Sequence, residues 1–176
     1  MSEVIMSISI PLDDEHYLRR ECNFCKKEFK IEIDEEDLKK QTEMLMQNYL
    51  DKDNHESKEE DNEIEAQVYY CPYCGQEAEM KTFWTIPQIE YIQTYVKNYV
   101  NNIINEKLIK EMEKINRRSN GIISFKGEKI QYIKPFIAPE ENDMEKYRLK
   151  CCNKEIKVEN VKGAIYCFYC GFKHEV

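Results

Sequence analysis

Hydrophobic and polar residues alternate near both ends of the chain. In the N-terminal part, Phe29, Ile31 and Ile33 are separated by charged residues, and near the C-terminus Ile156 and Val158 flank a lysine. A period of two residues is typical of β-strands with one buried face. We therefore expect a small β-unit at each end of the chain.

The middle of the chain follows a helical period instead. No glycine or proline lies between Gln88 and Asn120, and apolar residues recur every three or four positions. Thr85 and Gln88 have the spacing of a capping box, so residues 85–120 predict one long connecting helix. A helix of about 30 residues is about 45 Å long, more than one small β-unit can cover. We expect it to bend back, to pack against the other elements or to pair with another protein.

A shorter helix is expected as an insertion in the N-terminal β-unit. Asp34 is a suitable N-cap for a helix from about Glu35 to Leu50. The following stretch, Asp51–Glu63, contains seven acids, two lysines and no apolar residue. Such a composition is typical of a mobile loop, which is either a solvated insertion or an electrostatic docking segment. The helical and acidic insertion spans residues 34–63.

Two further patterns belong to the middle of the chain. Tyr91, Tyr95 and Tyr99 recur every four residues and form a second stripe on the long helix, for packing or for a partner. After the helix, residues 121–148 predict a β-hairpin with Gly127 in its turn, followed by a linker that contains prolines and acids.

Eight cysteines form four close pairs along the chain. The pairs are Cys22 with Cys25, Cys71 with Cys74, Cys151 with Cys152, and Cys167 with Cys170. In a reducing compartment, clustered thiols indicate metal binding or redox chemistry rather than a disulfide framework. Two loops of the CxxC type can surround a zinc ion tetrahedrally, with Zn–S distances of about 2.3 Å.

The two ends of the chain contain the same unit. "CKKEFKIE" from Cys25 and "CNKEIKVE" from Cys152 share five of eight residues, and "YYCPYCG" is echoed by "IYCFYCG". Cysteine ligands, a strand and a second cysteine pair followed by glycine describe a zinc ribbon. The sequence therefore predicts two structural zinc sites. Their ligands would be Cys22, Cys25, Cys71 and Cys74 in the first site, and Cys151, Cys152, Cys167 and Cys170 in the second.

The second predicted site has an unusual pair of ligands, because Cys151 and Cys152 are adjacent. Successive side chains of a regular strand point to opposite faces, so both thiols can bind one ion only if the backbone turns sharply there. Alternatively, one of them binds and His174 completes the site. A third alternative is an incomplete or empty second site.

Catalytic chemistry has little support in the sequence. The segment Cys71–Cys74 reads CPYC, which is identical to the active-site motif of glutaredoxins, but Gly75 follows at once and no good helix comes after it. We therefore predict a zinc-binding turn there rather than a thiol oxidoreductase site. The three histidines, His16, His55 and His174, form no recognisable catalytic pairing, and we predict that the protein is not an enzyme.

Charge argues against general nucleic-acid binding. The 176 residues carry a formal net charge of −8, and two zinc ions held by four thiolates each would move it to −12. Residues 145–176 have seven cationic against four acidic side chains, so a narrow contact through Lys154, Lys157 or Lys162 remains the alternative. No signal peptide and no stretch of about 18 apolar residues is apparent, so a cytoplasmic protein without membrane contact is expected.

Four segments together resemble a group of small uncharacterised bacterial proteins with a zinc ribbon at each end. These segments read "SISIPLDDEHYLRRECNFCKKEFK", "YYCPYCGQ", "FWTIPQIEYIQ" and "IYCFYCGF". In that group an adjacent Cys-His pair begins the C-terminal site, and Cys152 stands here where the group has the histidine. The resemblance implies that both adjacent cysteines are ligands. The resemblance implies an architecture, and it does not indicate an activity.

The expected architecture is α+β, with two small zinc-ribbon β-units joined by a long α-helix and a β-hairpin. Residues 1–84 form the N-terminal ribbon, 85–120 the connecting helix, 121–148 the hairpin and linker, and 149–176 the C-terminal ribbon. We expect a non-enzymatic adaptor or accessory subunit that docks a protein partner through the long helix or a ribbon edge. A nucleic-acid-binding accessory factor is the alternative.

Overall fold

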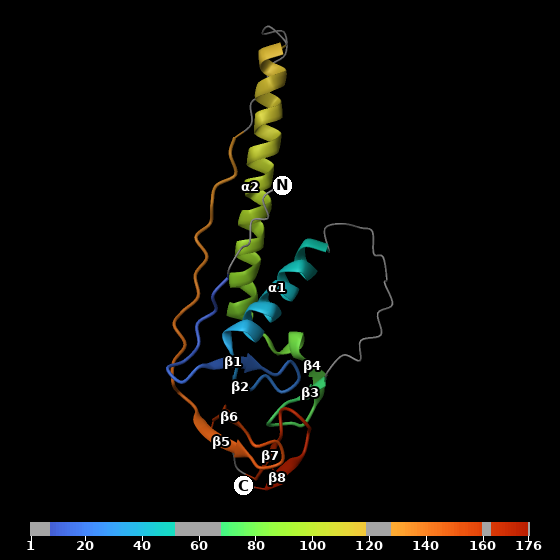
Figure 1. The fold of residues 1–176 in the computed structure, drawn as a ribbon, viewed down its shortest axis with the longest axis vertical. Coiled ribbons are helices and arrows are strands. Elements are labelled where there is room, and N and C mark those ends of the chain that lie inside the picture. The colour runs from blue at the N-terminus through green and yellow to red at the C-terminus, as the bar shows by residue number, and fades with distance from the viewer. Residues whose placement is uncertain (1–7, 52–67, 119–127, 160–162, 176) are drawn as a thin grey trace.

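The computed structural model describes residues 8–51, 68–118, 128–159 and 163–175. Strands gather at one end of the molecule and a long helix extends away from them (Figure 1). In chain order the described elements are β1 (Tyr17–Glu21), β2 (Glu28–Glu32), α1 (Glu35–Asp51), β3 (Val68–Tyr70), β4 (Glu77–Glu79), the 3₁₀ helix η1 (Met80–Phe83), α2 (Ile86–Arg118), β5 (Glu145–Leu149), β6 (Lys154–Val158), β7 (Ala164–Tyr166) and β8 (Lys173–Glu175). The mixed α+β class predicted from the sequence is confirmed.

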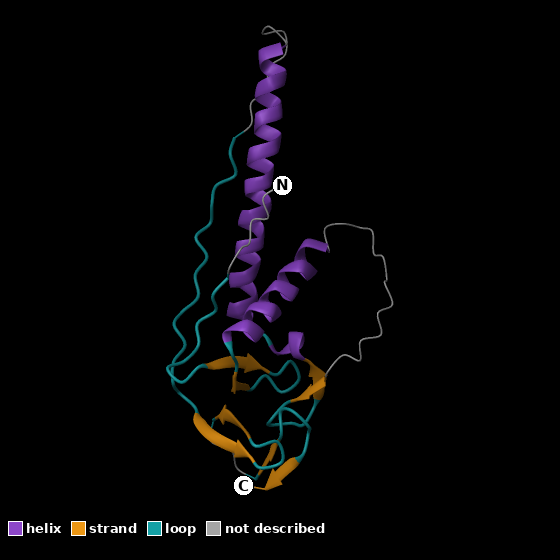
Figure 2. Ribbon diagram, in the orientation of Figure 1, coloured by secondary structure: helices purple, strands orange, loops and turns teal. Residues whose placement is uncertain are grey.

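Both ends of the chain contribute to one antiparallel sheet of four strands, in the order β1-β2-β6-β5. Across its centre Phe29 lies opposite Val158, Lys30 opposite Lys157 and Ile31 opposite Ile156. The sequence repeat aligns Lys30 with Lys157, so an approximate two-fold axis passes between these two residues. The sequence predicted β-units joined by a helix and a hairpin, whereas in the structure the two units also pair directly (Figure 2).

The two smaller hairpins obey the same approximate symmetry. Strand β3 pairs with β4, and β7 pairs with β8. The Tyr70 N–H donates to the carbonyl of Phe168, and the Tyr166 N–H donates to the carbonyl of Pro72, both at 2.9 Å. Tyr70 and Tyr166 are equivalent in the repeat, as are Pro72 and Phe168. The reciprocal bonds therefore hold each hairpin against the turn of the other.

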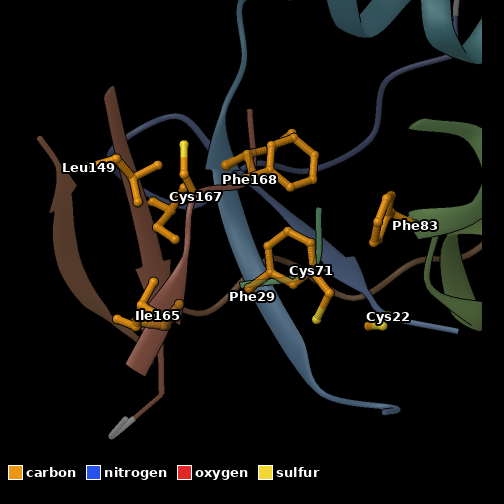
Figure 3. Close-up of a cluster of buried hydrophobic side chains, with 11 residues drawn as sticks. Cys22, Phe29, Cys71, Phe83, Leu149, Ile165, Cys167 and Phe168 are labelled. Atoms are coloured by element: carbon orange, nitrogen blue, oxygen red, sulfur yellow. The ribbon is translucent and has the colours of Figure 1, made fainter. Parts of the chain in front are cut away.

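Three phenylalanine rings form the centre of the core at this end of the molecule (Figure 3). The ring centroids lie 5.7 Å apart for Phe29 and Phe83, 5.4 Å for Phe29 and Phe168, and 5.6 Å for Phe83 and Phe168. Cysteines from both predicted sites are buried in the same apolar cluster. Because Phe29 and Phe168 come from opposite ends of the chain, the two ribbon units share one core.

Both helix starts predicted from the sequence are confirmed. The Asp37 N–H donates to Asp34 Oδ1 at 2.8 Å, which caps α1. The Thr85 N–H donates to Gln88 Oε1 at 3.0 Å, and the Gln88 N–H donates back to Thr85 Oγ1 at 3.4 Å. These two bonds are the reciprocal pair of a capping box, and they fix the first turn of α2 above the sheet.

The first part of α2 packs against α1, and the rest extends past the core. Leu38 and Met46 of α1 meet Ile92 and Val96 of α2 in a second apolar cluster, which also contains Trp84. The last buried residue of the 33-residue helix is Asn98. Packing therefore anchors α2 by its N-terminal part only, and the helix neither bends back nor covers the sheet.

The predicted β-hairpin at residues 121–148 is wrong in the part that the structure describes. Residues 128–143 form no strand and run as an extended segment, which we call the strap, back along α2 towards the sheet (Figure 2). The expected linker then ends in a strand, β5, which belongs to the C-terminal unit. The expected turn at Gly127 and the acidic segment from 52 to 63 lie outside the described residues. Alternation in "IISFKGEKIQYI" suggested strands, but the backbone groups of Ile130 and Ile133 bond to asparagine side chains of α2 instead of a neighbouring strand.

Candidate metal centres

Four cysteines from two turns meet to form the first cluster. Cys22 and Cys25 come from the β1–β2 turn, Cys71 and Cys74 come from the β3–β4 turn, and their Sγ atoms all lie within 4.8 Å of one another. The Sγ atoms of Cys22 and Cys74 are 3.8 Å apart, and those of Cys25 and Cys71 are 3.6 Å apart. A tetrahedron with Zn–S bonds of about 2.3 Å has edges of about 3.8 Å. The cluster therefore has the dimensions of a tetrathiolate metal site.

Local backbone geometry explains why each turn presents its two thiols to the same side. The Lys26 N–H donates to the carbonyl of Cys22, and the Gly75 N–H donates to that of Cys71, both at 2.9 Å. Lys26 and Gly75 each close their turn in the left-handed region, with φ of 60° and 71°. The Tyr73 N–H also donates to Cys71 Sγ at 3.4 Å, which stabilises charge on that sulfur.

Burial of the first cluster favours a bound cation. Cys22 and Cys71 are fully buried, Cys25 is partly buried and Cys74 is exposed. Burial raises the pKa of the Cys71 thiol well above its ordinary value, so without a cation this group stays protonated. All eight cysteines are free thiols, so no disulfide competes for the sulfurs. The donor set fits a soft divalent ion that removes the protons on binding.

The second cluster brings together Cys151, Cys152, Cys167 and Cys170, again with all Sγ atoms within 4.8 Å of one another. The Sγ atoms of Cys151 and Cys170 are 3.6 Å apart. Asn153 takes a left-handed φ of 51°, as Lys26 does at the equivalent position of the repeat. Because the backbone turns at residues 150–153, the two adjacent cysteines reach one site although they would diverge in a regular strand.

The two clusters are not equivalent in detail. The repeat aligns Cys22 with Leu149, which is fully buried at the end of β5 and offers no ligand. Cys151 supplies the missing thiol from the position that Phe24 occupies in the first unit. The second cluster therefore keeps four thiols, but Cys151 and Cys170 are exposed, and Cys167 is the one that is fully buried.

His174 adds a fifth candidate donor to the second cluster. Its Nε2 lies 3.2 Å from Cys151 Sγ, and its side chain lies at the centre of strand β8 with only 8% of the residue exposed. The rings of Tyr147 and Phe172 contact the imidazole with centroid distances of 6.1 and 5.1 Å. The structure thus brings the four thiols within metal-binding distance of one another and places His174 beside one of them, Cys151, outside that four-donor group.

The CPYC segment has the local structure of a metal-binding turn. Gly75 follows Cys74, and the chain then continues into strand β4 rather than into a helix. A glutaredoxin-type site needs its first cysteine at a helix N-terminus. Among the histidines, His16 lies in an exposed turn with a positive φ of 66°, and His55 lies outside the described residues.

One lysine proposed as a nucleic-acid contact is inside the protein. Lys157 is fully buried, and its Nζ lies 2.7 Å from Asp13 Oδ2 and 2.6 Å from Glu15 Oε2. The excess of cationic residues in 145–176 suggested an available lysine, but Lys157 on β6 is covered by the segment around Asp13. Of the other two lysines, Lys154 is exposed and Lys162 lies outside the described residues.

Sequence reasoning also missed two asparagines on α2. Asn98 Nδ2 donates to the carbonyl of Ile133 at 2.6 Å, and its Oδ1 accepts from the Ile133 N–H at 3.0 Å. Asn105 makes the same pair of bonds with Ile130, both at 2.8 Å. The seven-residue spacing of two asparagines inside a helix was the available signal. Together they bind the strap by its backbone.

The tyrosine stripe of α2 lies beside the strap. The rings of Tyr91 and Tyr95 meet edge to face at 5.1 Å, and their hydroxyl oxygens are 3.4 Å apart. Tyr95 and Tyr99 also line a shallow cavity of about 300 Å³ between α2 and the strap, together with Tyr132. The stripe therefore serves partly for packing within the chain.

No family model, curated protein or solved structure matches this chain. The resemblance to bacterial proteins with a zinc ribbon at each end therefore stays a prediction. Within the described residues, no helix combines the length and the apolar character needed to cross a membrane. The chain is thus a mixed α+β protein with two four-cysteine clusters that could hold metal ions.

Proposed function

We propose that this protein is a non-enzymatic zinc-binding module that serves as a cytoplasmic adaptor or accessory subunit for a protein partner. One observation carries the proposal. Two thiol clusters of the size of a metal site lie at the sheet end of the molecule. At the other end, α2 and the strap extend past the core and expose large apolar side chains. We therefore assign zinc a structural role at the sheet end, and we assign binding of the protein partner to α2 and the strap.

Zinc is the metal that suits both clusters. Tetrahedral sites with four thiolates are typical of structural zinc, and they leave no open position for a substrate. The strands that carry the ligands are three to five residues long, so they bury too little apolar surface to fold firmly by themselves. Structural zinc supplies an apparent ~10–16 kcal/mol near neutral pH, which is enough to make folding depend on the metal.

The strap surface is the proposed docking site, and it consists of Ile130, Tyr132, Ile133 and Phe136. Tyr132, Ile133 and Phe136 are 70%, 56% and 79% exposed. Large apolar side chains crowded within a few residues on an exposed segment are typical of protein-binding surfaces, and aromatic residues contribute most to such interfaces. A partner with an apolar groove or face is therefore favoured over a charged polymer.

The asparagine pair makes this surface suitable for recognition. One heptad of α-helix rises about 10.5 Å, and three residues of extended chain span about 10 Å. Asn98 and Asn105 are therefore spaced to hold Ile133 and Ile130, and both bonds go to the backbone. The side chains of Tyr132, Ile133 and Phe136 stay exposed while the backbone of Ile130 and Ile133 is held. Such preorganisation lowers the entropic cost of binding.

Three full-length proteins test the docking site. We compare the wild type, a strap variant with Tyr132→Ser and Phe136→Ser, and a control with Phe24→Ser and Phe172→Ser, whose two residues are exposed at the metal-binding end. Each of the three proteins is used to capture partners from a lysate of the cells that produce the wild type. The captured partner is then purified and titrated against each of the three. We expect the wild type and the control to bind equally, and the strap variant at least about tenfold more weakly, which corresponds to about 1.4 kcal/mol.

Two outcomes would contradict the proposal. In one, none of the three proteins retains a partner above background. In the other, the strap variant binds as tightly as the wild type while the control loses binding. The second outcome would assign the interface to the metal-binding end of the molecule.

A further inference from the structure

We propose that the second cluster is a three-plus-one metal site, in which Cys151 and His174 share the fourth position. Cys152, Cys167 and Cys170 hold the zinc in both arrangements. The inference rests on the proposed structural zinc at this cluster, and it goes further because it assigns His174 as a reserve ligand and Cys151 as a replaceable one.

The first observation is the number of donors in reach. Four Sγ atoms lie within 4.8 Å of one another, and His174 Nε2 lies 3.2 Å from Cys151 Sγ. A tetrahedral zinc ion accepts four ligands of this kind, so one of the five donors is in excess. With Cys151 bound, the imidazole is a neighbour of its sulfur. With Cys151 released, a movement of the imidazole from its place beside that sulfur would bring Nε2 to the vacated vertex.

The second observation is the contrast with the first cluster, which serves as an internal reference. The residue that the repeat aligns with His174 is Ala78, which has no donor atom. The residue that it aligns with Cys151 is Phe24, and the thiol at the first cluster comes instead from buried Cys22. The shifted cysteine and the added histidine thus occur together at one site. Cys151 lies in an exposed turn, where water competes for the metal more than at buried Cys22. A second donor, His174, can then keep the fourth position filled.

The third observation is that His174 has contacts of its own that do not involve Cys151. Its backbone pairs with Ile165 in the β7–β8 hairpin, and the rings of Tyr147 and Phe172 contact its imidazole. Only 8% of the residue is exposed. Because strand pairing and ring contacts fix the side chain, Nε2 stays near the site when Cys151 is absent. It binds as the neutral tautomer with its proton on Nδ1.

The exchange has a chemical consequence for Cys151. An exposed thiol that can leave the metal without opening the site is available to electrophiles while the zinc remains bound. With N-ethylmaleimide, the Cys151 sulfur adds across the ring's double bond, and the neighbouring carbon takes a proton from water. One S–C bond forms, no group leaves and no oxidant is needed. The structure therefore also assigns Cys151 as a modification site.

Metal content of full-length variants tests the proposal. We expect two zinc ions per chain in the wild type and also in Cys151→Ser, because His174 takes the fourth position. Cys151→Ser combined with His174→Ala is expected to keep one. The matched control is Cys25→Ser in the first cluster, which is expected to keep one zinc although it removes a single thiol, because Ala78 cannot replace it.

Absorption spectra of the cobalt-substituted variants provide a second measurement of the ligands at each site. In Cys151→Ser the sulfur-to-cobalt charge-transfer band of the second site weakens in proportion to the lost thiolate, while its tetrahedral ligand-field bands persist. The unchanged first-site spectrum shows that the variant is folded. In the wild type, maleimide labelling is expected to modify Cys151 first with no zinc released.

Three results would overturn the inference. One zinc in Cys151→Ser would show that the thiol is indispensable. Two zinc ions in the double variant would show that His174 is not a ligand. A wild type that binds only one zinc would overturn both this inference and the structural-zinc proposal for the second cluster.

Discussion

Asp13 is the anion between the two central lysines of the sequence repeat. Its Oδ2 lies 2.7 Å from Lys157 Nζ and 3.4 Å from Lys30 Nζ, and all three side chains are fully buried. Burial alone would raise the pKa of Asp13, but hydrogen bonds from Lys157 and from two backbone amides hold it below its ordinary value. The two lysines face each other across the approximate two-fold axis, and Asp13 is the fully buried carboxylate that both contact. Glu15 also pairs with Lys157, and Glu140 and Asp143 also pair with Lys30.

Replacing Asp13 by asparagine is expected to destabilise the zinc-loaded protein by about 1–3 kcal/mol, because it removes the fully buried anion that both lysines contact and leaves them only their more exposed partners, Glu15, Glu140 and Asp143. The measurement is denaturant unfolding at pH 7. The neighbouring exposed residue provides the control, since Asp14→Asn should change the free energy of unfolding by less than about 0.5 kcal/mol. Equal stabilities of the two variants would show that Asp13 contributes no net stabilisation.

The pH dependence of the same contact follows from the lowered pKa. A carboxyl group whose pKa is depressed by folding stabilises the protein above its unfolded value, near 3.8 for Asp13, and loses that effect as pH falls further. The stability difference between wild type and Asp13→Asn should therefore be constant between about pH 5 and about pH 7, and it should shrink in stronger acid. Denaturant unfolding of both proteins across this range measures it. A difference that is already lost near neutral pH would contradict the lowered pKa.

At the scale of elements, the strap and α2 form a unit that depends on side-chain amides. An asparagine that binds both the N–H and the C=O of one extended residue replaces the partner strand that this segment lacks. Alternation predicted a hairpin because the strap has the composition of a strand. The structure differs because two helical asparagines satisfy backbone groups that otherwise need a neighbouring strand.

Asn98→Ala is expected to free the strap near Ile133. Two backbone groups of Ile133 would lose their partners, at a cost of about 1–3 kcal/mol each if they remained buried, so the segment should open to water instead. The measurement is hydrogen exchange of residues 128–136. Faster exchange is expected there and not in the sheet, whereas Asn102→Ala, at an exposed position of α2, should leave it unchanged. Unaltered strap exchange in Asn98→Ala would mean that other contacts hold the strap.

At the scale of the whole molecule, the two cysteine clusters share one core. Cys71 of the first cluster and Cys167 of the second are buried in the same apolar group as Phe29 and Phe168. The reciprocal bonds between the hairpins add backbone contacts across the same boundary. Loss of metal from one cluster should therefore loosen the other.

Cys167→Ser is expected to lower the zinc content from two ions per chain to one and to speed release of the remaining zinc to a chelator. The physical reason is that the hairpin carrying Cys167 supports the turn carrying Cys71 through the Tyr166–Pro72 and Tyr70–Phe168 bonds. Leu108→Ser is the control, because that exposed residue of α2 lies outside both cysteine clusters and the shared core. Release of the first zinc at the wild-type rate would show that the two units are energetically independent.

The sequence by itself determined what depends on local spacing. Alternation predicted β2 and β6, capping residues predicted the starts of α1 and α2, and close cysteine pairs with a repeat predicted two four-thiol clusters. The strand and capping signals lie within a few residues, so backbone geometry alone interprets them, and the two clusters followed from short cysteine motifs that occur twice along the chain. The metal and the partner stay proposals.

Only the tertiary structure decided how these local pieces meet. The edge pairing of β2 with β6 joins residues more than a hundred positions apart, and so do the contacts of Asp13 with Lys157 and of Arg19 with Asp143. Over a shorter separation, of 23 positions, strand β8 places His174 beside Cys151. Pairing of this kind depends on the shape of assembled surfaces, and no periodicity along the chain encodes it.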